Sequence, residues 1–140
     1  MNLKLGLLLR QAHQRAADAL ASALAELNLT GRHFGVMLVL DRDAVSTQRD
    51  LIRETGSDKA GMVRTVEDLE KRGYLSRTTS AADRRVADLT LTDSGQAVFD
   101  AAKRRAARTA ESLFGTFSQA ELQTLESLLT RFLAATASDE

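Results

Sequence analysis

Hydrophobic residues recur at spacings of three and four along most of the chain, which is the pattern of amphipathic helices. The first predicted helix is on the order of 37 Å long at the usual helical rise, which is more than one small core requires. The second is apolar on nearly every side, as expected for a buried helix. The pattern predicts helices over residues 3–27, 31–41, 47–55, 58–72, 93–114 and 119–135.

Capping residues mark the ends of several of these helices. Thr30 and Ser57 can cap the helices that follow them, because their hydroxyl groups accept a backbone N–H of the first turn. Gly56 is a natural left-handed stop for the third helix, and Gly73 is predicted to end the fourth. Further helix starts are predicted at Thr47 with Asp50, at Thr92, and at Ser118 with Glu121.

The hydrophobic period changes from helical to alternating after Gly73. Residues 75–79 and 86–91 are predicted to form two strands, joined by a small, polar tip over residues 80–85. Helix, tight turn, helix and hairpin follow one another in the order of a winged helix-turn-helix. We therefore expect a mainly α fold with a small β-hairpin wing, in the α+β class.

Composition and charge exclude several classes of protein. The 140 residues suit one domain, and with no cysteine the chain has no disulfide, thiol switch or cysteine-ligated zinc site. The 19 basic and 19 acidic residues cancel, so any nucleic-acid surface must be local. No apolar run is long enough to cross a membrane, which predicts a cytoplasmic protein. No nucleophile motif or phosphate-binding loop is present, so we expect no enzyme activity, no metal and no cofactor.

Three motifs then follow one another at a spacing that is specific only when they are taken together. The recognition-helix motif ends in Leu-Glu-x-x-Gly, the wing carries Asp-x-Arg, and the next helix opens with Leu-Thr-x-x-Gly. They are Leu69-Glu70-Lys71-Arg72-Gly73, Asp83-Arg84-Arg85 and Leu91-Thr92-Asp93-Ser94-Gly95. In this order the chain resembles the MarR family of bacterial transcriptional regulators, and the long flanking helices extend the resemblance over nearly its whole length.

The resemblance implies a homodimer that binds double-stranded DNA. A single MarR-like domain covers residues 1–140, with a DNA-binding lobe over 30–95 and dimerisation helices over 1–29 and 96–140. Two recognition helices about 34–36 Å apart imply a pseudo-palindromic operator. A ligand-responsive repressor is the expected function. The alternatives are a winged-helix module for protein partners and a ligand-binding protein with weak DNA binding.

Candidate DNA contacts lie on the fourth helix and on the hairpin. Arg64 points away from the apolar face and is the first choice for reading a base, although a surface pair with Asp68 is the alternative. Arg85 resembles the wing arginine that enters the minor groove, with Asp83 holding it, unless the tip is merely a mobile charged loop. The full expected set is Ser57, Lys59, Ala60, Gly61, Arg64, Thr65, Arg77, Asp83, Arg84 and Arg85.

Many family members carry small hydroxyl residues where this chain has Ala60 and Gly61. This difference removes two hydrogen-bond donors from the expected DNA face. The family also binds effectors between the dimerisation helices and the winged lobe. His13, Arg32 and His33 are the candidates to line such a cleft and to meet a small aromatic or anionic effector. For His33, the alternative is a partly buried side chain with a structural hydrogen bond.

Overall fold

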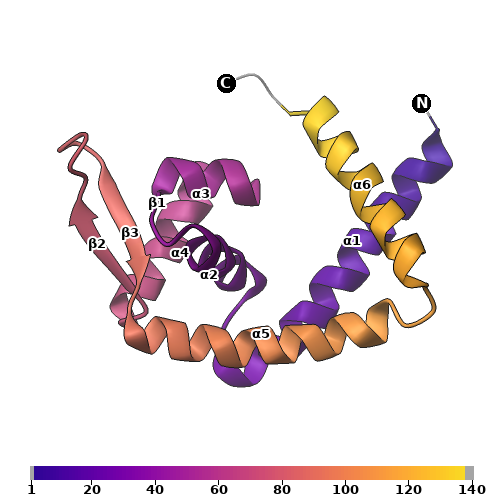
Figure 1. Ribbon diagram of the computed structural model, residues 1–140, viewed down its shortest axis with the longest axis horizontal. Helices are drawn as coiled ribbons and strands as arrows, with labels where there is room; N and C mark the ends of the chain where they lie inside the picture. Colours follow the sequence, from indigo (N-terminus) through magenta and orange to yellow (C-terminus); the bar gives the residue numbers. More distant parts are fainter. Residues whose placement is uncertain (1, 138–140) are drawn as a thin grey trace.

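The computed structural model describes residues 2–137, and its elements follow the predicted order (Figure 1). A short 3-10 turn, η1, continues the first helix, and a two-residue strand precedes the third. The elements are α1 (Leu3–Leu24), η1 (Ala25–Leu27), α2 (Gly31–Asp43), β1 (Ser46–Thr47), α3 (Gln48–Thr55), α4 (Lys59–Lys71), β2 (Leu75–Thr79), β3 (Ala87–Leu91), α5 (Asp93–Leu113) and α6 (Gln119–Ala135).

Local capping chemistry sets most of these boundaries. The hydroxyl groups of Thr30 and Thr47 each accept the backbone N–H of the third helical residue, and the side chain of that residue accepts the backbone N–H of the threonine. Gly56 has φ of 70°, the left-handed conformation predicted for it, and Gly73, which follows α4, is left-handed as well with φ of 77°. The first helix is shorter than predicted, because it tightens into η1 and stops at Asn28, which is itself left-handed with φ of 54°.

The predicted hairpin is present and gains a third strand. β2 and β3 pair antiparallel with Leu75 opposite Leu91, and β1 pairs with β3 through Ser46 and Leu89, giving the order β1-β3-β2. The pairing of β1 with β3 joins segments far apart in the sequence, which the local pattern does not reveal. Figure 1 shows the hairpin projecting from the opposite end of the molecule to α6.

The core lies between α2, the other elements of the lobe and the long helix α5. Phe99 of α5 is fully buried and its ring lies 5.5 Å from that of Phe34 on α2. Gly95, at the start of α5, presses against the backbone of Tyr74, so that a β-carbon there would collide with the Tyr74 carbonyl. This close approach explains the glycine of the Leu-Thr-x-x-Gly motif and fixes α5 to the end of the recognition helix.

Large apolar side chains remain exposed on α1 and at the C-terminal end of the chain. Leu3 is 75% exposed and Leu133 is 66% exposed, far more than a monomer core would leave. The other exposed apolar residues on these elements are Leu5, Leu7, Leu8, Leu113, Phe114, Phe117, Leu125, Leu128, Leu129 and Phe132. Within residues 2–137, no helix is both long enough and apolar enough to cross a membrane.

Candidate nucleic-acid interface

The recognition helix α4 has one buried and one exposed side. Met62, Val66 and Leu69 are buried against the lobe, whereas Lys59 and Arg64 are exposed. The exposed side chains are therefore the ones available to a nucleic acid. Ala60 is exposed beside them.

Arg64 does not form the surface pair that was its alternative role. Within the described part of the chain it makes no ion pair, and Asp68 instead contacts His33 at 2.7 Å and Arg72 at 3.1 Å. The guanidinium of Arg64 thus remains free for a partner outside the lobe.

The start of α4 differs from the sequence prediction, because Asp58 rather than Ser57 caps it. The Asp58 carboxylate accepts the backbone N–H of Gly61 at 3.1 Å, and this bond lowers the pKa of that carboxyl group. The helix begins one residue later than expected. The Ser57 backbone N–H instead donates to the Thr55 hydroxyl at 3.4 Å.

Gly61 and Thr65 belong to the buried side of α4, so their expected place on the DNA face is wrong. Both are buried, and the Thr65 hydroxyl donates to the Gly61 carbonyl at 2.9 Å. The guanidinium of Arg32 lies where a β-carbon on Gly61 would sit. Positions 61 and 65 therefore extend the inner stripe of Met62, Val66 and Leu69 by one helical row.

The wing arginine is anchored at its base. The two carboxylate oxygens of Asp83 accept hydrogen bonds from Nε and Nη2 of Arg85, each at 3.2 Å, and the Arg85 backbone N–H donates to the same group at 3.0 Å. These bonds lower the pKa of the Asp83 carboxyl group. The Arg85 side chain is nonetheless 90% exposed, so its orientation is set while its surface stays open. Arg84 beside it is exposed as well.

Arg77 has a structural partner. Its guanidinium donates to Glu70 of α4 at 2.8 Å, and this hydrogen bond raises the pKa of the arginine. The pair joins the wing strand β2 to the recognition helix. Arg77 therefore braces the wing, which explains its place without any phosphate contact.

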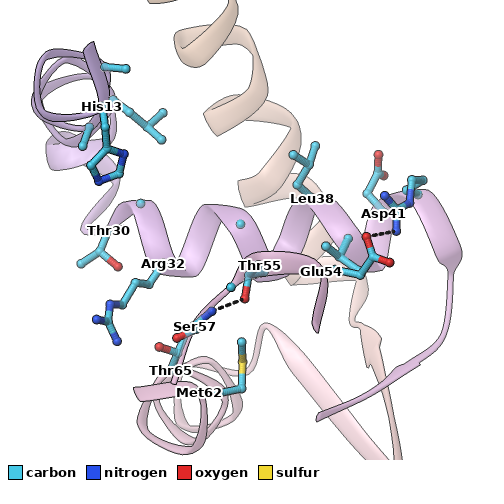
Figure 2. Close-up of a pocket in the computed structure, with 18 residues that line it drawn as sticks. His13, Thr30, Arg32, Leu38, Asp41, Glu54, Thr55, Ser57, Met62 and Thr65 are labelled. Atoms are coloured by element: carbon cyan, nitrogen blue, oxygen red, sulfur yellow. Dashed lines mark hydrogen bonds and ion pairs between the residues drawn. The ribbon is translucent and has the colours of Figure 1, made fainter. Parts of the chain in front are cut away.

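A groove separates α1 from the lobe and contains two of the three expected effector residues. His13 of α1 and Arg32 of α2 line it, together with apolar residues that include Leu20 and Met62, around a volume of 1270 Å³. Figure 2 shows the His13 imidazole on the α1 side and Arg32 reaching from α2 toward the segment that begins α4. Nη1 of Arg32 lies 3.7 Å from the Asp58 carboxylate.

Sequence reasoning missed the remaining groove residues, because they come from four separate segments. At the far end of the groove, Arg42 pairs with Glu54 of α3 at 3.2 Å. Asp58 escaped notice as well, although aspartate is among the residues preferred at a helix N-cap. Ser57 carries an equally suitable side chain one residue earlier.

His33 lies outside the groove, so the structure contradicts its placement among the groove-lining effector residues. Its ring is buried, with Nδ1 accepting the Thr30 backbone N–H at 3.0 Å and Nε2 lying 2.7 Å from Asp68. Because Nδ1 is an acceptor, the proton of the neutral ring is on Nε2 and points at Asp68. The alternative of a structural hydrogen bond is confirmed. Burial lowers the pKa of His33, the charge of Arg72 lowers it further, and Asp68 offsets part of this effect.

The pKa of His33 predicts loss of stability in mild acid. Its folded pKa is below the ordinary value of 6.5, so the unfolded chain takes up the proton more readily. The contribution of His33 to the free energy of unfolding is full above the pKa that the residue has in the unfolded chain. It declines as the pH falls below that pKa, by at most about 1.4 kcal/mol per pH unit. Thermal unfolding from about pH 7.5 to about pH 5.5 should lower the Tm more for the wild type than for His33→Gln. Glutamine can keep the capping bond and cannot be protonated, so equal slopes would contradict this role.

Taken together, a helix-turn-helix with an exposed arginine and an anchored wing arginine defines a winged-helix DNA-binding protein. The model of the MarR family matches residues 27–86. The transcriptional repressor NicR of Pseudomonas putida is 29% identical over 130 residues, covering 93% of this chain and 82% of NicR.

Solved structures agree over nearly the whole length. A probable transcriptional regulator from Pseudomonas aeruginosa is 31% identical with a TM-score of 0.81, covering 91% of this chain and 95% of its own. Bordetella bronchiseptica BpsR, whose structure is described as a mechanism for regulation of DNA binding by 6-hydroxynicotinic acid, is 29% identical with a TM-score of 0.83. That match covers 92% of this chain and 98% of BpsR. The chain belongs to the MarR family. It is a DNA-binding transcriptional regulator, and the family consists of regulators rather than enzymes.

Proposed function

We propose that the protein is a cytoplasmic repressor that binds a pseudo-palindromic operator as a homodimer. The observation that carries this proposal is the pair of arginines on one lobe. Arg64 is exposed on the recognition helix, and Arg85 is exposed at the wing while Asp83 holds it at 3.2 Å. An arginine can contact guanine through two hydrogen bonds in the major groove, and a wing arginine suits the negative potential of a narrow minor groove.

The exposed apolar faces of α1 and α6 support the homodimer. They lie at the end of the molecule away from the wing, so that pairing there leaves both lobes free (Figure 1). Residues 1–29 and 96–140 are accordingly the dimerisation part, and residues 30–95 are the lobe. Two lobes related by a twofold axis require two half-sites about one helical turn of DNA apart.

A small aromatic carboxylate is the proposed effector, bound in the groove between α1 and the lobe. The apolar walls suit a ring, and the Arg32 guanidinium suits a carboxylate through paired hydrogen bonds. In this site the carboxylate competes with Asp58, the cap of the recognition helix, for Arg32. The acid releases DNA only if it binds the released geometry more tightly than the DNA-bound one.

Replacing Arg32 with alanine should desensitise the repressor to the acid. With 6-hydroxynicotinic acid as the probe, we expect the variant to need about tenfold more acid to release its operator, because a charged hydrogen bond to the ligand is lost. Fluorescence anisotropy of a labelled operator duplex measures both affinity and release. Arg108→Ala, on α5 and outside the groove, removes the same charge; it is the matched control and should respond as the wild type does. Release at the same acid concentration in wild type and Arg32→Ala would contradict the proposed site.

A further inference from the structure

A chain of polar contacts joins the C-terminal end of the recognition helix to the junction between η1 and α2. One carboxylate oxygen of Asp68 contacts both Nε2 of His33, at 2.7 Å, and Nη2 of Arg72, at 3.1 Å. Nη1 of Arg72 donates to the backbone carbonyl of Asn28. We call these four residues the hinge latch.

The latch crosses the boundary between the two parts of the molecule. Asn28 is the left-handed residue that ends η1, with φ of 54° and ψ of 33°, and the lobe begins two residues later. Arg72 caps the C-terminal end of α4 and reaches back over 44 positions of sequence to Asn28. The C-terminal end of the recognition helix is thus hydrogen-bonded directly to the segment that connects η1 to the lobe.

We propose that Asp68 and Arg72 are positioning residues that set the angle of the lobe, and hence the distance at which the two recognition helices of a dimer meet their half-sites. The inference rests on the proposed homodimeric repressor. Neither residue needs to touch DNA for this role. The observation behind the proposal is the hydrogen bond from Arg72 to the Asn28 carbonyl, which restrains the connection between η1 and the lobe.

His33 fixes the position of the Asp68 carboxylate within the latch. Its ring is held by Thr30, whose backbone N–H donates to Nδ1 at 3.0 Å, so that Nε2 faces Asp68. Asp68 is in turn the shared acceptor that orients the guanidinium of Arg72 toward Asn28. Thr30, which holds His33, also lines the groove, so the latch adjoins the proposed effector site.

Distances between the two lobes test the latch without DNA. The chain has no cysteine, so Ala60→Cys places a single spin label on each exposed recognition-helix face. Pulsed electron resonance on the labelled dimer should give a narrow distance distribution, and addition of Arg72→Ala should broaden it. An unchanged distribution in Arg72→Ala would overturn the latch alone. If the labelled Ala60→Cys protein that keeps Arg72 gave no interspin distance, the proposed dimer would be overturned and the latch with it.

DNA binding by unlabelled protein separates positioning from direct contact. Arg72→Ala should weaken operator binding about tenfold, with a smaller penalty for operators whose half-site spacing is changed by one base pair. The slope of log affinity against log salt should stay at the wild-type value, since no phosphate contact is lost. Arg72→Lys, which keeps the charge and one donor group, should recover part of the affinity.

Lys71→Ala removes the same charge from the neighbouring position, where the side chain is exposed, and should not change the preference for half-site spacing. A shallower salt slope in Arg72→Ala would show a direct phosphate contact and overturn the positioning role. An unchanged operator affinity would overturn it as well.

Discussion

Reversing the charge of the wing arginine, Arg85→Glu, should weaken operator binding about 100-fold or more, because a homodimer loses two groove contacts and gains two repulsive charges near phosphate. The side chain is 90% exposed, and within residues 2–137 its hydrogen bonds and its ion pair are with Asp83, so the fold does not depend on it. Anisotropy of a labelled operator measures the loss, and size-exclusion chromatography should show an intact dimer.

Arg108→Glu is the matched control for this experiment. Arg108 is exposed on α5, outside the lobe, and its substitution by glutamate changes the net charge by the same amount. The Arg108→Glu variant should bind the operator far more tightly than the Arg85→Glu variant does. Equal affinity of Arg85→Glu and the wild type would remove the wing from the DNA interface.

Substitution of Gly95 by alanine should cause the largest loss of stability. The added methyl group would be forced into the Tyr74 carbonyl, and backbone cannot move aside as a flexible side chain can. We expect a loss of about 3 kcal/mol, at the upper end for overpacking, and a Tm lower by about 6–12 °C. Thermal unfolding followed by circular dichroism measures this change.

Gly35→Ala is the matched control, since Gly35 also lies within a helix. Its nearest neighbour would be a methyl group of Thr55 at 3.7 Å, an ordinary contact distance. We expect its Tm to remain at the wild-type value or rise, because alanine favours helix over glycine. A Gly95→Ala protein as stable as Gly35→Ala would show that α5 is not packed against Tyr74 as described.

The fold could be predicted from sequence because its signals are local. Thr30, Thr47 and Thr92 cap helices through residues three positions away, and Gly56 and Gly73 stop them within one residue. The change from helical to alternating period marked the hairpin to within a residue. These signals depend only on residues nearby in the chain, so they can be recognised without knowledge of tertiary contacts.

The site was less predictable, because its residues are defined by distant partners. Gly61 is covered by the guanidinium of Arg32 from another helix, and no spacing within the recognition helix reveals that contact. Thr65 was assigned to the DNA face and is buried. The burial of His33 depends on Asp68 and Arg72 of another helix, which no spacing in its own helix reveals.

Sequence-specific DNA binding is the central claim, and one titration tests it most directly. Fluorescence anisotropy at two salt concentrations compares the duplex upstream of the protein's own gene with a shuffled duplex of equal composition. We predict at least about a thousandfold preference for the native duplex. Its affinity should fall steeply with salt, as phosphate contacts require. Equal and weak binding to both duplexes would contradict the repressor and favour a winged-helix module that serves a protein partner.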